Sequence, residues 1–347
     1  MIKLRVTDRN VTKREMPKMA DRPQLDPQTA VVLADLTGPG SVPVSNQSPQ
    51  EARASIQRFA AKWDLDPRPG IGAFEDFKIP GGASGVNMPA RLYRPVGRTD
   101  PLPVLVFVHA GGFVFGSIET HDSFCRLISA EAECLVLSFE YRLAPEHKFP
   151  AAHEDSYSAL RWVSENATGI GADPDRIAVG GDSSGGTMAI AACAMAAERG
   201  GPAVTKLMLW YPGTSGGPPT ESMKNLSEGY FLDSALMRWS MGHYLNGLED
   251  MAHPWVAPLK MLDFSVLPPT YLMTAGFDPR HDDNALFVDA LVAAGVEAEF
   301  HSIPNTIHGF MFMLGGIDLA VEAAKDGASH LKGVFGGTLL LPRLLES

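Results

Sequence analysis

Apolar and polar positions alternate between strand-like and helix-like segments from about residue 70 onward. Residues 104–109 and 135–141 are mostly apolar runs, as expected for strands of a sheet that is covered on both faces. Residues 151–165 instead carry large apolar side chains at spacings that can share one face of a helix: Tyr157, Leu160, Trp162 and Val163. The pattern therefore predicts strands and helices that follow one another along the chain.

The same criteria predict further strands at residues 176–180, 206–211, 270–275 and 298–303, and further helices at residues 184–199, 285–294 and 319–331. Residues 74–80 and 88–95 are typical of an antiparallel pair, because a glycine-rich stretch separates them. Asp173-Pro174-Asp175 predicts a turn before the strand at residue 176. This order predicts an α/β fold with a mainly parallel central sheet flanked by helices. Its ligand site should lie at the carboxyl ends of the strands.

Two regions do not fit the alternation. Residues 1–70 contain helix candidates at 29–36 and 51–63, with a loop rich in Gly, Pro and Ser between them. Residues 213–266 open with a similar loop and then carry large apolar side chains: Met223, Tyr230, Phe231, Met237, Trp239, Met241 and Tyr244. We expect the two regions to form a helical cap over the sheet, with these side chains around an apolar pocket. The alternatives are peripheral decoration for both regions and a core role for the side chains.

The composition narrows the possible partners. The chain has 347 residues, of which 45% are hydrophobic, so it can bury a large core. Its 34 glycines and 27 prolines indicate many tight connections. The net charge is −11 and no basic block is present, which argues against binding to nucleic acids or anionic membranes. The ordinary explanation of this negative charge is solubility.

The cysteines and the first residues bear on the cellular compartment. Cys125, Cys134 and Cys193 lie in mostly apolar surroundings and in no metal-binding spacing, so we expect buried, reduced thiols. Residues 1–6 become charged at once, so no signal peptide is expected. No apolar run approaches the ~18 residues of a membrane-spanning helix. The sequence thus predicts a cytoplasmic protein without stable membrane insertion.

The stretch Gly181-Asp182-Ser183-Ser184-Gly185-Gly186 lies between a predicted strand and a predicted helix. In that setting, Gly-x-Ser-x-Gly is typical of a nucleophile elbow, a sharp turn that exposes the serine hydroxyl. Gly181 and Gly185 are the small residues that such a turn needs on either side of Ser183. The alternative is a glycine-rich turn whose serine caps the next helix.

A serine hydroxyl becomes a strong nucleophile when a neighbouring base, usually a histidine oriented by a carboxylate, takes its proton. After an elbow serine, the acid and then the histidine follow along the chain. Asp278 and His308 fit this order, since each comes just after a predicted strand. Taken singly, Asp278 before proline suits a turn, and His308 suits an ordinary loop. The rival acids Asp282 and Asp283 fall in the first turn of the following helix, where they complement its dipole.

Acyl transfer also needs hydrogen-bond donors for the oxyanion of the tetrahedral intermediate. The loop His109-Ala110-Gly111-Gly112-Phe113 follows the strand at 104–109, where lipases and esterases carry a His-Gly-Gly-Gly loop. We predict an oxyanion hole formed by the amides of Gly111, Gly112 and Ser184. His109 is interpreted as loop support through a hydrogen bond, rather than as a second base.

The combination of motifs over about residues 74–312 resembles the bacterial hormone-sensitive-lipase-like family of α/β-hydrolase esterases. The segments that carry the resemblance are His109–Gly112, Tyr141-Arg142-Leu143-Ala144-Pro145-Glu146, Phe149-Pro150-Ala151-Ala152, the elbow, Asp278-Pro279 and His308-Gly309-Phe310. The resemblance implies an α/β-hydrolase fold and a catalytic triad of Ser183, Asp278 and His308. It also implies hydrolysis of short- to medium-chain carboxylic esters with neither cofactor nor metal ion.

The resemblance further suggests how the chain is divided. Residues 1–70 and 213–266 would form the cap, and residues 71–212 and 267–347 would form the two parts of the catalytic core. A homodimer is expected from the resemblance and from an edge position of the strand at 298–303. His281, Asp282 and Asp283 do not suggest a metal site, because adjacent helical residues point in different directions.

Two departures from the family are visible. Ala110 replaces the first glycine of the usual triplet, and Arg280-His281 follows Asp-Pro where leucine is usual in first place. We expect the oxyanion hole to survive the first change and the contacts behind the acid to differ with the second. We assign no family motif to the first 50 residues, so the sequence leaves the shape of the acyl pocket open. An amidase or lactonase on the same triad stays open, as does a small-molecule receptor on this scaffold, although such receptors typically lack the base that His308 would supply.

Overall fold

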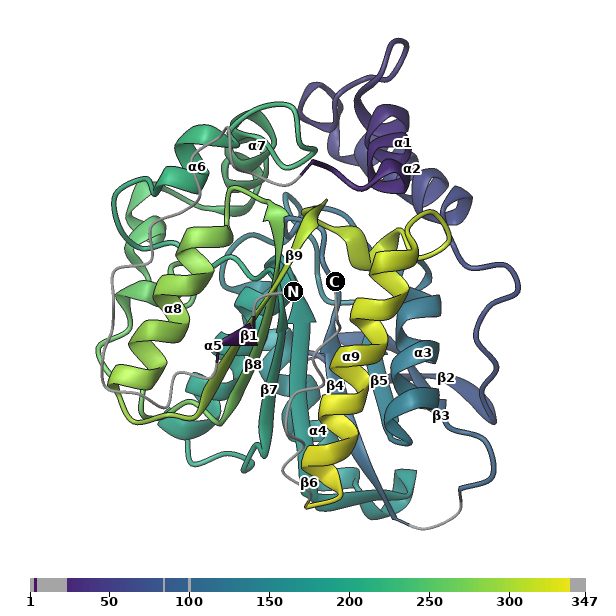
Figure 1. Cartoon of the computed structure of the whole chain (residues 1–347). Helices are drawn as coiled ribbons and strands as arrows, with labels where there is room; N and C mark the ends of the chain where they lie inside the picture. The colour runs from purple at the N-terminus through teal and green to yellow at the C-terminus, as the bar shows by residue number, and fades with distance from the viewer. Residues whose placement is uncertain (1–2, 5–23, 84, 99–100, 338–347) are drawn as a thin grey trace.

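The computed structural model describes residues 3–4, 24–83, 85–98 and 101–337 (Figure 1). Six parallel strands form the centre of its sheet: β4 (Leu102–Val108), β5 (Leu135–Phe139), β6 (Ala172–Asp182), β7 (Lys206–Trp210), β8 (Thr270–Phe277) and β9 (Ala298–Ile307). They are neighbours in the order β9-β8-β7-β6-β4-β5. Each strand predicted from the apolar runs is therefore confirmed, with bounds shifted by a few residues.

The remaining strands extend the sheet at both ends. β3 (Asn87–Arg94) pairs antiparallel with β5, and β2 (Ala73–Pro80) pairs antiparallel with β3, as predicted. At the other end, β1 (Lys3–Leu4) pairs antiparallel with β9 at His301 and Phe300. The edge position expected for residues 298–303 is therefore wrong at these two residues, because a segment nearly 300 positions away supplies a further strand. The homodimer inferred partly from that position stays a prediction.

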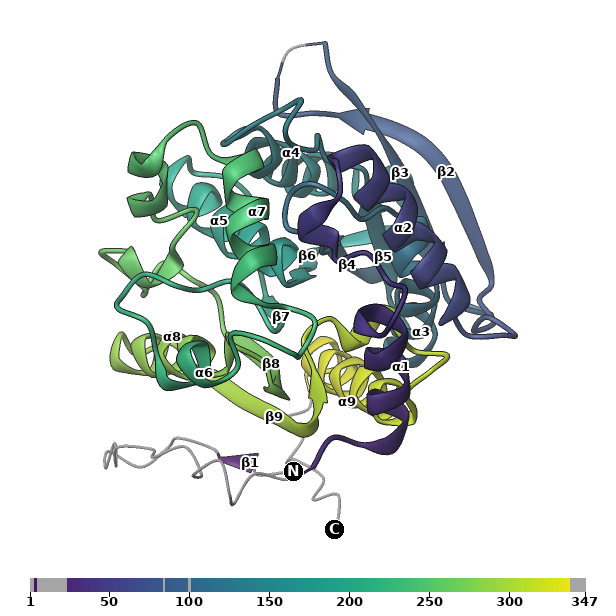
Figure 2. The same cartoon turned by 90° about the horizontal axis from the view of Figure 1, so that it is seen from above.

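Helices cover both faces of the sheet, as two views of the chain show (Figures 1 and 2). One face packs against α4 (Ala151–Asn166), α5 (Ser184–Glu198) and α8 (His281–Ala293), and the other against α3 (Asp122–Ala132) and α9 (Asp318–Phe335). Along β4, Val104, Val106 and Val108 belong to the first cluster, whereas Leu105 and Phe107 belong to the second. Both sets are fully buried, which is why this strand has no polar alternation.

The helices at the end toward which the parallel strands point come from the two irregular regions (Figure 1). These are α1 (Pro27–Thr37) and α2 (Pro49–Lys62) from the first region, and α6 (Glu221–Asn225) and α7 (Ser234–Tyr244) from the second. α2 begins with a capping box in which Ser48 and Glu51 satisfy each other's backbone amides. The indole of Trp239 on α7 donates to the carbonyl of Gln47, 3.1 Å away, and so joins the two regions. The division into cap and core stays a prediction, which these positions favour.

Short 3₁₀ helices complete the described secondary structure: η2 (Val44–Asn46), η3 (Glu119–His121), η4 (Thr168–Ile170), η5 (Leu248–Ala252), η6 (Pro258–Lys260) and η7 (Phe310–Phe312). The turn predicted at Asp173–Asp175 lies within β6, where the register with β4 shifts between Ala172 and Ile177. The carboxylate of Asp173 accepts the amide of Asp175 at 2.9 Å there. The turn is thus an irregularity inside the strand rather than its start.

Two expectations about the rest of the chain can be compared with the fold. All three cysteines are free and buried, as predicted, and burial raises the pKa of each thiol above its usual value. Such thiols are poor nucleophiles. Among the residues described, no helix combines the length and the apolar character that crossing a membrane requires.

Candidate active site

Ser183 occupies the sharp turn between β6 and α5. Its φ of 52° and ψ of −119° lie in a region that residues other than glycine rarely adopt. A Cβ atom on Gly181 would lie 2.5 Å from the carbonyl carbon of Gly185, and one on Gly185 would lie 2.0 Å from the carbonyl oxygen of Val108. The two glycines therefore allow the close approach that holds the elbow in its strained form.

The side chains of Ser183, His308 and Asp278 form one hydrogen-bonded line. Nε2 of His308 lies 2.7 Å from Oγ of Ser183, and Nδ1 of His308 lies 2.7 Å from Oδ2 of Asp278. Since a carboxylate only accepts, Nδ1 donates to Asp278, and Nε2 is free to accept the serine proton. His308 is only 4% exposed and Asp278 is fully buried, so little water competes for these bonds.

Strand geometry explains why three distant segments meet here. Ser183 follows β6, Asp278 follows β8 and His308 follows β9, and these parallel strands end at the same edge of the sheet. The second oxygen of Asp278 accepts the backbone amide of Arg280 at 2.8 Å, which fixes the carboxylate. The rival acids Asp282 and Asp283 instead begin α8, as predicted.

The loop after β4 presents backbone amides beside the elbow. Gly111 and Gly112 have φ values of 141° and 55°, and a Cβ on Gly111 would lie 1.8 Å from the carbonyl oxygen of Phe115. Within the described residues, the amides of Gly111, Gly112 and Ser184 donate to no acceptor. Unpaired donors of this kind suit an incoming oxyanion.

His109 lies under this loop and is fully buried. Its Nδ1 donates to the carbonyl of Ala110, 2.8 Å away, and its ring stacks on Tyr141 with centroids 4.3 Å apart. The hydroxyl of Tyr141 in turn donates to the carbonyl of His109 at 3.0 Å. These contacts favour the predicted supporting role.

A second buried carboxylate lies beside the elbow and was not predicted from the sequence. Asp182 accepts the amide of Ala110 at 2.8 Å through Oδ1. Its Oδ2 lies 3.2 Å from the hydroxyl of Tyr211 and 3.3 Å from Nε2 of His121. The available signal was an aspartate inside the apolar end of β6, but its partners come from three other segments and share no spacing with it.

The second irregular region contacts the predicted oxyanion loop, His109–Phe113, directly. Tyr244 on α7 stacks on Phe113, with ring centroids 3.9 Å apart and planes 6° apart. Its hydroxyl lies 2.6 Å from Nδ1 of His153, whose Nε2 lies 2.9 Å from the carbonyl of Trp255. The carbonyl can only accept, so Nε2 donates and Nδ1 accepts. Burial lowers the pKa of His153 to about 3, which keeps this ring neutral.

The large apolar side chains of the second irregular region divide between two environments. Tyr244 is fully buried against the body of the protein, and Tyr230 packs on Phe277 with centroids 5.1 Å apart. Phe231 instead faces Phe312, which belongs to the histidine loop at residues 308–313, with ring centroids 6.1 Å apart. A core role therefore holds for part of this set, and a pocket role stays a prediction for the others.

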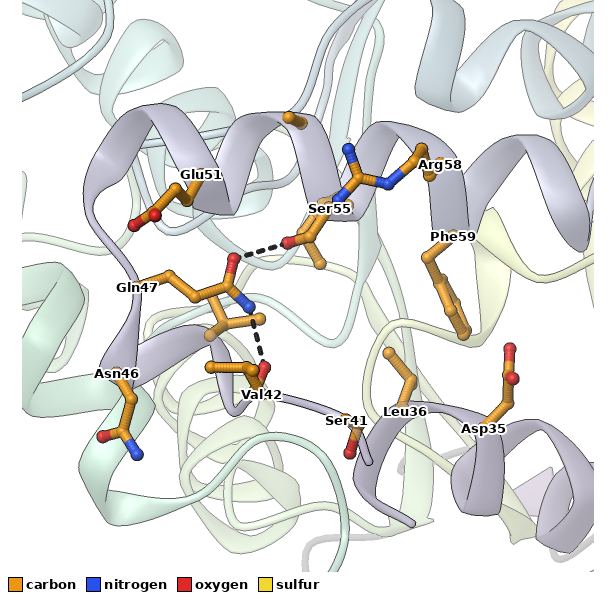
Figure 3. A pocket seen from close by; sticks show the side chains of 13 residues that line it. Asp35, Leu36, Ser41, Val42, Asn46, Gln47, Glu51, Ser55, Arg58 and Phe59 are labelled. Carbon is orange, nitrogen blue, oxygen red and sulfur yellow. Dashed lines mark hydrogen bonds between the residues drawn. The ribbon is translucent and has the colours of Figure 1, made fainter. Parts of the chain in front are cut away.

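The structure contains a pocket of about 520 Å³ between α1, η2 and α2 (Figure 3). Ser55 donates to the side-chain oxygen of Gln47 at 2.8 Å on its wall, and the Gln47 amide donates to the carbonyl of Val42 at 2.7 Å. Phe59, another lining residue, packs edge-on against Phe312 at 6.1 Å. The pocket thus adjoins the histidine loop through one pair of rings, but none of the predicted triad residues lines it.

The unusual Arg280-His281 pair makes its own contacts. The guanidinium of Arg280 bonds the hydroxyl of Ser215 and lies 3.7 Å from Asp283, whose pKa is raised by burial. His281 lies 3.2 Å from Asp282 and 3.3 Å from Ser302. The contacts behind the acid are therefore polar in this chain, and their difference from those of the family stays a prediction. Among the described residues no cluster of three His, Cys, Asp or Glu side chains could hold a metal ion.

Comparison with known proteins agrees with this geometry. Residues 105–312 match the family described as alpha/beta hydrolase fold. Carboxylesterase NlhH of Mycobacterium tuberculosis is 35% identical over 315 residues, which cover 90% of this chain and 96% of its own length. Esterase LipI of the same organism is 38% identical over 268 residues, which cover 76% of this chain and 82% of its own length.

A solved structure extends the likeness to three dimensions. The ester hydrolase EH1AB1 from the metagenome of Lake Arreo superposes with a TM-score of 0.86 at 35% identity, over 90% of this chain and 100% of its own. The family match spans more than half of this chain, and the relatives agree over most of their lengths. This chain therefore belongs to the α/β-hydrolase fold family, in its hormone-sensitive-lipase-like branch.

Proposed function

We propose that this protein is a serine carboxylesterase that hydrolyses short- to medium-chain carboxylic esters through an acyl-enzyme on Ser183. The relatives named carboxylesterase, esterase and ester hydrolase support the reaction class. The observation that carries the assignment of residues is the line of two 2.7 Å hydrogen bonds from Ser183 through His308 to Asp278. A fully buried acid is the partner that an imidazolium needs in the transition state.

In the first half of the reaction, Oγ of Ser183 attacks the ester carbonyl carbon while its proton passes to Nε2 of His308. The carbonyl oxygen becomes an oxyanion and accepts hydrogen bonds from the unpaired amides of Gly111, Gly112 and Ser184. The carbon–oxygen bond to the alcohol then breaks, and the alcohol leaves with the proton from Nε2. Asp278 stabilises the positive charge on the imidazole during this step.

In the second half, a water molecule attacks the acyl carbon and gives its proton to Nε2 of His308. The same amides hold the second oxyanion. When the bond to Oγ breaks, the proton returns from Nε2 to Ser183 and the carboxylic acid leaves. One base therefore serves both halves, and these steps use no cofactor or metal ion.

The proposal is tested by the hydrolysis of p-nitrophenyl butyrate by the wild-type protein and by Ser183→Ala. We expect kcat to fall by about 10⁴–10⁶ in the variant, with an unchanged melting temperature. Ser156→Ala is a matched control, since Ser156 is a buried serine on α4 outside the site. Activity of Ser183→Ala close to that of this control would refute the assignment.

An amidase or lactonase would use the same triad. Comparison of kcat/KM for a matched ester, anilide and lactone with the same acyl group separates these activities. We expect the ester to be favoured, because the relatives are named esterases. A higher kcat/KM for the anilide or the lactone would replace ester hydrolysis by that activity.

We further propose that the helices of residues 1–70 and 213–266 act as the cap that bounds the acyl pocket. The ring of Phe231 next to Phe312, and the hydroxyl of Ser240 next to Gly112, support this role. A series of p-nitrophenyl esters from acetate to palmitate tests it. We expect kcat/KM to peak at short or medium chains in the wild-type protein and to shift toward longer chains in Phe231→Ala. An unchanged chain-length profile in that variant would contradict the cap role of this ring.

A homodimer is a separate proposal, supported by the family likeness and by the shortness of β1, which pairs with β9 at His301 and Phe300 alone among the described residues. Light scattering at micromolar concentrations should give twice the mass of one chain. A monomer throughout that range would refute it.

A further inference from the structure

Asp182 is a buried acid beside the elbow that the proposed reaction leaves without a role. Its side chain is fully buried at the end of β6, directly before Ser183. Three donors from three other segments converge on its two oxygens: the amide of Ala110, the hydroxyl of Tyr211 and Nε2 of His121. A buried carboxylate with this many partners is costly to disturb, because any donor left unpaired stays away from water.

One of these bonds fixes the oxyanion loop. The amide of Ala110 donates to Oδ1 at 2.8 Å, and Ala110 directly precedes Gly111 and Gly112. Both glycines have positive φ and follow Ala110 directly, so the position of the Ala110 amide limits where the next two amides can lie. Oδ1 therefore ties the predicted oxyanion donors to the strand that carries the nucleophile.

The other oxygen reaches the histidine loop through Tyr211. The hydroxyl of Tyr211 donates to Oδ2 and accepts the amide of Met311 at 3.1 Å, and its ring packs on the imidazole of His308 with centroids 4.8 Å apart. The backbone of Tyr211 has a φ of 38°, a conformation that a bulky residue keeps only when its surroundings hold it. The hydrogen bond from the Tyr211 hydroxyl to Oδ2 is one of the contacts that stabilise this backbone conformation.

We propose that Asp182 is a positioning residue that keeps the oxyanion amides and the imidazole of His308 in register with the hydroxyl of Ser183. It does not touch the substrate. It acts through Ala110 on one side and through Tyr211 on the other. One carboxylate thereby sets both the distance from the oxyanion amides to the Ser183 hydroxyl and the distance from the His308 imidazole to that hydroxyl. This inference rests on the proposed esterase function.

The test uses Asp182→Asn and Tyr211→Phe in the full chain. Asparagine keeps the shape and can still accept from Ala110, but its NH₂ group would face the donors of Tyr211 and His121. Phenylalanine removes one hydroxyl and keeps the ring against His308, so it serves even if Asp182→Asn fails to fold. Asp155→Asn is the matched control, because Asp155 is another fully buried carboxylate that accepts the backbone amides of Gly82 and Arg142.

The readouts are kcat per active site, counted with a fluorophosphonate, KM for p-nitrophenyl butyrate, and the affinity of an aryl trifluoromethyl ketone, which forms a tetrahedral oxyanion on the serine. We expect kcat to fall about 10- to 100-fold in Asp182→Asn and about 3- to 10-fold in Tyr211→Phe, with KM changed less than about 3-fold. The affinity for the ketone should fall by the same factor as kcat/KM. Asp155→Asn should lower the melting temperature and keep kcat per site.

Values of kcat per site within about 2-fold of the wild type in both variants would overturn the inference. Equal losses in Asp182→Asn and Asp155→Asn would also overturn it, because they would reveal a general effect of disturbing a buried acid. A wild-type protein that neither hydrolyses the ester nor reacts with the fluorophosphonate would instead refute the proposed function, and the two failures are therefore distinct.

Discussion

Nε2 of His308 lies 2.7 Å from Oγ of Ser183, although 125 positions separate the two residues along the chain. The contact exists because β6 and β9 are parallel strands of one sheet, and each ends just before one of these residues. The topology of the sheet therefore brings the imidazole within hydrogen-bond distance of the serine hydroxyl.

The first prediction concerns Asp278→Asn. Oδ1 of Asp278 accepts the Arg280 amide, so an asparagine that keeps this bond turns its NH₂ group toward Nδ1 of His308. Nδ1 must then accept, the proton moves to Nε2, and the ring can no longer take the proton of Ser183. We expect kcat to fall by about 10⁴, measured with p-nitrophenyl butyrate.

Asp282→Asn is the matched control for that variant, because Asp282 is the nearby acid that begins α8. Its kcat should stay within about 3-fold of the wild type, although the bond to the Ser222 amide is weakened. If Asp282→Asn lost as much activity as Asp278→Asn, the assignment of the orienting acid would be wrong.

The second prediction concerns Gly111→Ala. The added Cβ would lie 1.8 Å from the carbonyl oxygen of Phe115, and the φ of 141° is unfavourable for alanine, so the loop must move. We expect kcat to fall by about 10²–10³, as for the loss of one oxyanion donor, with a smaller change in KM. Gly217→Ala is the control, because a Cβ added there would meet no atom within 4 Å in the described part of the chain beyond its own neighbours. Equal activity of the two variants would contradict the role of the loop.

The sequence alone could predict those features that lie within one continuous segment or at the end of one strand. The elbow was recognisable because Gly181, Ser183 and Gly185 are close together in sequence, and Asp278 and His308 were recognisable because each comes just after a predicted strand. The expected order along the chain, first the serine, then the acid and then the histidine, selected these two residues. The three predicted triad residues are therefore visible in the sequence without any knowledge of the distances between them.

Other features depend on contacts between segments and could not be predicted in this way. α3 was not predicted from the sequence, because it begins at Asp122, an acid that is nevertheless buried. The carboxylate of Asp122 accepts hydrogen bonds from Arg91 on β3 and from Arg126 one turn further along α3. The pairing of β1 with β9 joins residues 3–4 to a strand nearly 300 positions further along the chain. The partners of Asp182 come from three segments with no common spacing. In each case the sequence contains the residue but not the distance to its partner.

The third prediction concerns pH. His153 has a pKa of about 3 in the folded protein because it is buried, against 6.5 in the unfolded chain. Between these values the unfolded chain binds a proton that the folded protein does not, so stability falls as the pH is lowered from 6.5 toward 3. The neutral variant His153→Gln lacks this contribution.

We therefore expect the free energy of unfolding to fall more steeply in the wild type than in His153→Gln between pH 6.5 and pH 4, by up to about 3 kcal/mol over the interval. Urea denaturation at several pH values measures both slopes. Identical slopes would show that His153 does not stay neutral in the folded state.

The fourth prediction concerns Arg53, which connects α2 to the oxyanion loop. Its guanidinium donates to the carbonyl of Val114 and to that of Ala144, each at 2.8 Å, and pairs with Glu146. We expect Arg53→Met to reduce the free energy of unfolding by about 1.5–3 kcal/mol and kcat by less than about 10-fold. Thermal melts and steady-state kinetics measure the two effects.

Arg58→Met is the matched control for Arg53→Met. Arg58 lies on the same helix, is exposed, and has no hydrogen-bond or ion-pair partner among the described residues. This variant should keep the stability of the wild type within about 0.5 kcal/mol. If Arg58→Met lost as much stability as Arg53→Met, the loss would come from replacing any arginine of this helix. The hydrogen bonds and the ion pair of Arg53 would then not explain it.

The central claim is that a hydroxyl at position 183 is activated by the imidazole at position 308, and the most direct measurement is the rate and site of fluorophosphonate modification, followed by intact-mass and peptide mass spectrometry. The wild-type protein should gain one adduct, on the peptide that contains Ser183, and His308→Ala should form it at least about 10³-fold more slowly. An adduct on another residue, or equal rates in the two proteins, would contradict the claim.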